Sequence, residues 1–168
     1  MTVPSATLAR EQADRAWLDV AVGLARHARA TGNRPFGAVL VSPADNELAR
    51  ACNTVLTDGD VTGHAETNVV RLATGRPGTS DLAEATLYTS TEPCAMCAGA
   101  IVLAGIGRVV YALSAGELAA IPGASKAVRT LPASLSDSMD QRDGIPTMVH
   151  YPLASATDVH SGFWAVTP

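Results

Sequence analysis

The chain has 168 residues, of which 47% are hydrophobic, 17% charged and 4% aromatic. This length fits about one domain, at roughly 150 residues per domain, and the composition excludes general disorder. The formal net charge of -4 has the wrong sign for a protein held mainly by the phosphates of a nucleic acid. We therefore predict a single domain over residues 1–168, with a less well defined lid and tail over 115–168, and a partner other than nucleic acid.

Charged residues near the N-terminus, such as Arg10 and Asp14, interrupt any apolar run that would serve as a signal peptide. The longest apolar stretch, 97–107, is far shorter than the roughly 20 residues that a transmembrane helix needs. We therefore expect a cytoplasmic protein without a membrane span.

The first half of the chain alternates between helical and strand patterns. Apolar residues at three- and four-residue spacing predict an amphipathic helix over 8–30. Short runs rich in branched residues predict two strands, 36–41 and 47–54, joined as a hairpin by a turn. After a polar loop, helical spacing returns over 63–74.

The second half continues with strands separated by helices. We predict a strand over 85–89, a helix over 93–103 and a strand over 108–113. Beyond Gly116 we expect a loop or lid with at most one short helix, then a last strand over 147–153 and a closing helix or tail. This order indicates an α/β fold, a three-layer α/β/α sandwich around a mixed sheet of about five strands.

Two short motifs carry side chains that bind metals. His64-Ala-Glu66 opens one predicted helix, and Cys94-Ala-Met-Cys97 opens the next. Cys94 and Cys97 lie on one helix face, where the free N–H groups of the first turn favour thiolates. With His64 they form a His/Cys/Cys set that leaves the fourth tetrahedral position of a zinc ion for water, as in catalytic sites. Glu66 fits a proton carrier there, provided that His64 and Glu66 lie at the helix end.

Two alternatives remain for these residues. A redox pair of the thioredoxin type would explain the two cysteines but not His64 or Glu66. A structural zinc site would need a fourth ligand, for which the candidates are Cys52, His27, His150 and His160. Apart from that alternative, we expect Cys52 to be a small buried residue and assign the other histidines no role.

The chain resembles the cytidine deaminase superfamily, whose members carry His-x-Glu and Pro-Cys-x-x-Cys motifs. The stretch TLYTSTEPCAMCAGAI, residues 86–101, followed by GRVVY at 107–111, is similar to the branch that holds guanine deaminases and tRNA adenosine deaminases. The resemblance covers about 35–113 and implies the cytidine deaminase-like fold, a homodimer and Glu66 as the catalytic proton shuttle. It also implies one Zn²⁺ per chain, whose ligands are His64, Cys94 and Cys97.

The resemblance also implies residues that bind the substrate. Asn53 matches an asparagine that hydrogen-bonds the base, Phe36 matches an aromatic position over the ring, and the backbone of Ala65 faces the substrate. Trp164 either anchors the tail or lines the pocket. Guanine deaminases carry an acidic pair after the fourth strand, which the segment 120–125 lacks. The candidates for a second proton carrier are therefore Glu117, Asp137, Asp140 and Asp143.

The expected activity is zinc-dependent hydrolytic deamination of a free nucleobase or nucleoside, with release of ammonia. Glu66 would carry protons from the zinc-activated water to a ring nitrogen and to the leaving amine. Guanine is the first candidate substrate, because of Phe36 and the overall pattern, and cytosine or a pterin follows. Deamination of tRNA adenosine is the alternative, which the acidic charge and the single lysine disfavour. A non-catalytic zinc scaffold is the remaining hypothesis.

Overall fold

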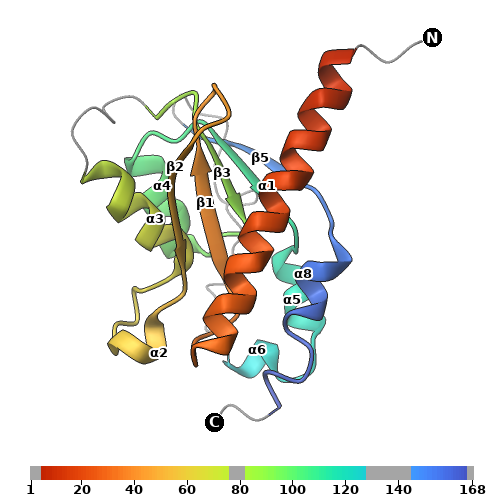
Figure 1. The fold of residues 1–168 in the computed structure, drawn as a ribbon. Helices are drawn as coiled ribbons and strands as arrows, with labels where there is room; N and C mark the ends of the chain where they lie inside the picture. Colours follow the sequence, from red (N-terminus) through yellow and green to blue (C-terminus); the bar gives the residue numbers. More distant parts are fainter. Residues whose placement is uncertain (1–4, 76–81, 128–144, 166–168) are drawn as a thin grey trace.

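The structure is a computed structural model that describes residues 5–75, 82–127 and 145–165. The described strands form a five-stranded sheet in the order β2-β1-β3-β4-β5 (Figure 1). β1 pairs antiparallel with β2 and β3, whereas β3 with β4 and β4 with β5 pair parallel, so the sheet is mixed as predicted. The strands are β1 (Gly37–Val41), β2 (Glu47–Cys52), β3 (Thr86–Thr89), β4 (Arg108–Tyr111) and β5 (Thr147–His150).

Helices cover both faces of this sheet (Figure 1). In β1, Val39 and Val41 pack with residues of α1, whereas Ala38 and Leu40 pack with residues of α3 and α4 on the opposite face. The alternation confirms the three-layer α/β/α arrangement. No helix in the described ranges has the length and apolarity to cross a membrane. The helices are α1 (Ser5–Ala30), α2 (Val55–Asp58), α3 (Ala65–Thr74), α4 (Ala95–Leu103), α5 (Ala115–Ala120), α6 (Ala124–Ala127) and α8 (Ala154–Asp158).

Three short helices differ from the sequence prediction. α2 lies where we expected only a polar loop, and both α5 and α6 lie beyond Ser114, where the expectation of at most one short helix is wrong. α5 begins with a capping box, in which Ser114 Oγ accepts from the Glu117 amide and the Glu117 carboxylate accepts from the Ser114 amide. The acidic candidates Asp137, Asp140 and Asp143 lie outside the described residues.

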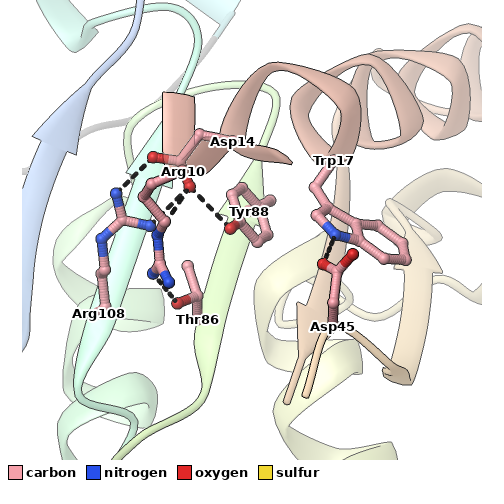
Figure 2. Close-up of polar contacts among 7 residues, drawn as sticks. All are labelled: Arg10, Asp14, Trp17, Asp45, Thr86, Tyr88 and Arg108. Carbon is pink, nitrogen blue, oxygen red and sulfur yellow. Dashed lines mark hydrogen bonds and ion pairs between the residues drawn. The ribbon is translucent and has the colours of Figure 1, made fainter. Parts of the chain in front are cut away.

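A buried polar network fastens α1 to the sheet (Figure 2). Asp14 accepts hydrogen bonds from the Arg108 guanidinium at 2.8 and 2.6 Å and from the Tyr88 hydroxyl at 2.8 Å. Arg10 pairs with Asp14 at 3.5 Å and donates to Thr86 Oγ1 at 3.2 Å. Burial raises the pKa of Asp14, but the hydrogen bonds from Arg108 and Tyr88 and the nearby positive charges lower it by more. The net pKa therefore lies below its ordinary value. The carboxylate is therefore ionised at neutral pH and completely paired.

β2 and β3 precede the segments that carry the His64 and Cys94 motifs, and both strands end at the same edge of the sheet. The strand register places Gly37 beside Cys52 and Ala38 beside Thr89, so the start of β1 adjoins the ends of β2 and β3. α1 crosses β1 closely at this point, because a Cβ atom on Gly37 would lie 2.3 Å from the carbonyl oxygen of Ala21. In α/β sheets, ligands bind outside the carboxyl ends of the parallel strands, which is where this edge lies.

Candidate metal centre and active site

Two helix N-termini bring the metal-binding side chains together. His64 is the N-cap of α3, with extended backbone angles of φ -72° and ψ 152°, and Cys94 is the N-cap of α4, with φ -70° and ψ 168°. An N-cap residue leaves the helical path, so its side chain reaches toward residues of the first turn. His64 and Glu66 therefore approach the same site although they are two positions apart, as the sequence analysis required.

The three proposed ligand atoms have the spacing of a tetrahedral zinc site. The sulfurs of Cys94 and Cys97 are 3.6 Å apart, and each lies 3.5 Å from His64 Nδ1. Zn–S bonds near 2.3 Å and Zn–N bonds near 2.0 Å separate ligands on a tetrahedron by about 3.5 to 3.8 Å. These residues thus fit a zinc ion. In the described part of the chain, the cluster does not include any of the candidate fourth ligands Cys52, His27, His150 and His160.

The two cysteines differ in protonation. The hydrogen bond shared with Cys97, with a further one to His64, lowers the pKa of Cys94 to about 4 although burial opposes the change. The same hydrogen bond, together with burial, raises the pKa of Cys97. Cys94 is therefore a thiolate at neutral pH, which is the form that binds a metal.

Glu66 lies beside the cysteines with both carboxylate oxygens engaged. The Thr89 hydroxyl lies 3.3 Å from Oε1, and the Cys97 thiol lies 3.6 Å from Oε2. Only 6% of Glu66 is exposed, and burial raises the pKa of its carboxyl group. Thr67 contacts the Cys97 sulfur at 3.7 Å. The sequence analysis missed Thr89 and Thr67, because only β3 and α3 in their folded positions bring these hydroxyls to the site.

Asn53 and Phe36 are joined at the same edge of the sheet. The Asn53 amide donates to the Phe36 carbonyl at 3.0 Å, and Asn53 Oδ1 accepts from the Val55 amide at 3.2 Å. Asn53 is 1% exposed, and its Nδ2 has no partner among the described residues. Ala65 is the first residue of α3, so the helix offers its N–H no acceptor. The Asn53 Nδ2–H group therefore has no partner within the described fold, and the Ala65 N–H has none within its helix.

Trp164 and Glu117 lie in different surroundings. Trp164 is 4% exposed, belongs to the core and lies 6.1 Å from the Phe36 ring, so it anchors the tail and also borders that ring. Glu117 is occupied by the capping box of α5 and by His150 Nε2 at 3.3 Å. The bonds to Ser114 lower the pKa of Glu117 and keep it ionised. The Glu117 carboxylate is thus engaged by residues of α5 and β5, and its contacts do not support a role as a second proton carrier.

His160 has a place that the sequence analysis did not foresee. It is completely buried, and its ring lies 5.3 Å from the Phe36 ring. Trp164 follows four residues later and donates its indole Nε1–H to His160 Nδ1 at 3.3 Å. A histidine and a tryptophan at this spacing in a closing segment is the signal that could have marked the residue.

Comparison with known proteins identifies the family. The sequence profile described as the cytidine and deoxycytidylate deaminase zinc-binding region matches residues 11–113, more than half of the chain. The chain belongs to this deaminase family. The deaminase is a hydrolase of C–N bonds whose cofactor is zinc, and its fold is that of the family, as the sequence predicted.

The relatives of this deaminase differ in their named substrates. It is 40% identical over 152 residues to a probable cytosine deaminase of Schizosaccharomyces pombe, across 90% of the chain and 92% of that relative. It is 38% identical over 112 residues to the tRNA-specific adenosine deaminase of Haemophilus influenzae, across 67% and 65%. The crystal structure of guanine deaminase from Bacillus subtilis is 33% identical, with a TM-score of 0.60 across 90% and 91%. These relatives share the class of reaction and leave the substrate undecided.

Proposed function

We propose that the protein is a hydrolytic deaminase of a small free nucleobase, with His64, Cys94 and Cys97 as zinc ligands and Glu66 as proton carrier. The proposal is carried by the convergence of three ligand atoms, all within 4.8 Å of one another, beside a buried carboxylate. When bound, zinc supplies a water activated for attack on the ring carbon that bears the amine.

The residues of the chain then move protons and orient the base. Glu66 accepts a proton from the attacking water and delivers it to the ring nitrogen beside the reacting carbon. It next delivers the second proton of that water to the leaving amine, so the base and water give the oxo base and ammonia. Asn53 Nδ2–H and the Ala65 N–H serve as donors to a carbonyl of the base, and Phe36 contacts the face of its ring.

The loop before the metal ligands supports a small uncharged substrate. This segment, 54–63, leads directly into His64, and a backbone hydrogen bond of 2.8 Å joins its first and last residues. It carries the exposed carboxylates Asp58 and Asp60 and no lysine or arginine. Its acidic charge repels the phosphates of an RNA. We therefore favour a free base over tRNA, although tRNA-specific relatives share part of the chain.

Guanine and cytosine are the two candidate bases. Guanine is supported by Phe36 and by the likeness to the Bacillus subtilis guanine deaminase structure. Cytosine is supported by the 40% identity, across 90% of the chain, to the probable cytosine deaminase. Both bases carry an amine next to a ring nitrogen and a carbonyl elsewhere on the ring, so both suit the donors of Asn53 and Ala65.

The test is ammonia release by the zinc-loaded protein from guanine, guanosine, adenine, adenosine, cytosine, cytidine, a pterin and a tRNA anticodon stem-loop. The Glu66→Ala variant is the blank, and its zinc content and circular dichroism confirm that the site is intact. We expect turnover of one free base. Turnover of the stem-loop alone would replace this proposal with tRNA deamination, and silence of a zinc-loaded protein on all compounds would favour the scaffold hypothesis.

We further propose that the protein forms a homodimer through α4. This helix is almost entirely apolar, yet Leu103 is 91% exposed and Met96 37% exposed, and Leu72 on α3 is 46% exposed. Exposed apolar side chains gathered on neighbouring helices are typical of a protein interface. Sedimentation velocity should show a dimer for the wild type and a monomer for Leu103→Glu. A wild-type monomer at micromolar concentration would refute the proposal.

A further inference from the structure

His160 is a buried histidine whose protonated nitrogen is defined by its neighbour. The indole N–H of Trp164 can only donate, so His160 Nδ1 is the acceptor in the bond between them. Burial and the nearby charge of Arg29 lower the pKa of His160 to about 4, so the ring is neutral at pH 7. A neutral imidazole with an accepting Nδ1 carries its proton on Nε2. His160 Nε2–H is therefore a hydrogen-bond donor.

This donor has no acceptor among the described residues. The Nε2 atom is inaccessible to solvent, and the whole residue is 0% exposed. Buried polar groups in native proteins almost always have a partner, so an open donor of this kind calls for a ligand or an ordered water. The feature differs from a core histidine, because only one of its two nitrogens is satisfied within the fold.

The contacts of His160 link it, through Phe36, to the sheet edge at which the candidate site lies. Its ring packs against Phe36, whose carbonyl accepts from the Asn53 amide. Three other side-chain atoms are buried and unpartnered in the described part of the chain. All three belong to segments at the sheet edge near His64, Cys94 and Cys97, which we call the ligand triad. These atoms are Arg34 Nε, Asn53 Nδ2 and Thr91 Oγ1. His160 Nε2 is the fourth atom of this set, which we call the open polar set.

Helix α1 holds the turn that carries His160. Arg29 donates to the carbonyl of Val159 at 2.7 Å and to the carbonyl of Ser161 at 2.9 Å, on both sides of the histidine. The same guanidinium lies 5.8 Å from the centre of the Phe163 ring. These contacts, together with Trp164, fix the backbone and the ring of His160. The donor is therefore oriented before any substrate binds, which favours selective binding.

We propose that His160 is a specificity-determining residue whose Nε2–H donates a hydrogen bond to an acceptor on the part of the base that does not react. The inference rests on the proposed deaminase function and names the chemistry that the site selects. A fixed N–H donor forms a hydrogen bond with a carbonyl oxygen or an unprotonated ring nitrogen, but not with an amino group at the same position. The site therefore selects an oxo base over the analogue in which an amine replaces the oxygen.

Kinetics on matched substrate pairs test this selection. If the substrate is guanine, the pair is guanine and 2,6-diaminopurine, and if it is cytosine, the pair is cytosine and 2,4-diaminopyrimidine. We expect His160→Phe to lower kcat/KM for the oxo base about tenfold, mainly through KM, and to reduce the preference over the amino analogue. His160→Gln, which keeps a donor, should retain more of the preference. The exposed His27→Phe is the matched control.

Nuclear magnetic resonance of wild-type protein labelled with ¹⁵N-histidine gives a second measurement that needs no variant to fold. The His160 signals should show a proton on Nε2, and saturation with the oxo product should shift that resonance but not the resonance of His27. An unmoved His160 signal, or an unchanged preference in a folded His160→Phe protein, would overturn the inference. If the wild type turns over no base, the proposed function fails. The shift of the His160 resonance on addition of each unreacted base then still shows whether that base contacts His160.

Discussion

Two groups of buried polar side chains in this deaminase differ in whether the fold supplies their partners. On the α1 face, Asp14 is bonded to Arg108 and Tyr88, and the network is complete (Figure 2). At the edge with the ligand triad, the open polar set has no partners among the described residues. A complete network stabilises the fold, whereas open donors and acceptors cost stability unless a ligand completes them. The first group therefore stabilises the fold, and we propose that the second binds the substrate.

The largest expected effect is the loss of activity in Glu66→Gln without loss of stability. Glutamine keeps the size of the side chain but cannot carry a proton, so kcat should fall about 10²- to 10⁴-fold. Zinc content and the midpoint of thermal unfolding should stay within error of the wild type or rise, because a buried carboxyl group is removed. Assays with the identified substrate and metal analysis measure both, and loss of zinc would indicate a structural role instead.

Asp14→Asn should have the opposite profile. Removing the carboxylate leaves the Arg108 guanidinium, whose side chain is 20% exposed, without its charge partner. Loss of one member of a buried pair costs about 3 kcal/mol of the free energy of unfolding. Urea unfolding measures this loss, with the exposed Asp19→Asn on the same helix as control. kcat/KM of the folded variant should be unchanged, and a large drop in it would mean that the two groups are not separate.

Low pH should reduce the free energy of unfolding through His160, a member of the open polar set. The pKa of His160 in the fold is about 4, below the ordinary 6.5, so the unfolded chain binds this proton more readily. The stability that comes from neutral His160 is complete above pH 6.5 and is lost as the pH falls from 6.5 toward 4. We expect about 2 kcal/mol of it to be lost between pH 7 and pH 5. Urea unfolding at both pH values should show a smaller loss in His160→Gln, and an equal loss would contradict the assignment.

The smallest expected effect is that of Asn53→Ala. The substitution removes the open Nδ2 donor, so kcat/KM should fall about tenfold through loss of one hydrogen bond to the base. It also removes the acceptor of the Val55 amide, but deletion of an unpartnered donor offsets part of that cost. Stability should therefore change by less than about 1 kcal/mol. Steady-state kinetics and thermal unfolding distinguish this outcome from a structural role, which would reverse the two magnitudes.

The parts of this protein that could be predicted from sequence depend on local patterns. Long helices follow from apolar periodicity, and the buried strand β1 follows from a short run of branched apolar residues, Val39, Leu40 and Val41. The candidate metal cluster could be predicted because His64, Cys94 and Cys97 sit in short motifs with a defined chemistry, and the structure brings their ligand atoms within 4.8 Å of one another.

The remaining features depend on contacts between distant segments or on elements too short to show a period. α2, α5 and α6 have four to six residues each, less than two helical turns. For α5 the capping box was present in the sequence, but Glu117 was interpreted as a candidate proton carrier. His160 meets Phe36 from the opposite end of the chain, and Thr89 meets Glu66 only after β3 and α3 have packed. Local sequence patterns do not predict such long-range contacts.

Helix α1 contacts both the Asp14 network and the segment that carries His160. It carries Asp14 in its first half and Arg29 in its last turn, roughly 22 Å apart at 1.5 Å per residue. Gly37 lets this rod lie directly on β1, and a methyl group there would push it outward from the sheet. Arg29 donates to the backbone on both sides of His160. A displacement of α1 would therefore also move the segment that carries His160, without any contact to the proposed zinc ligands. The close contact between α1 and Gly37 thus fixes the position of a histidine that lies on another segment of the chain.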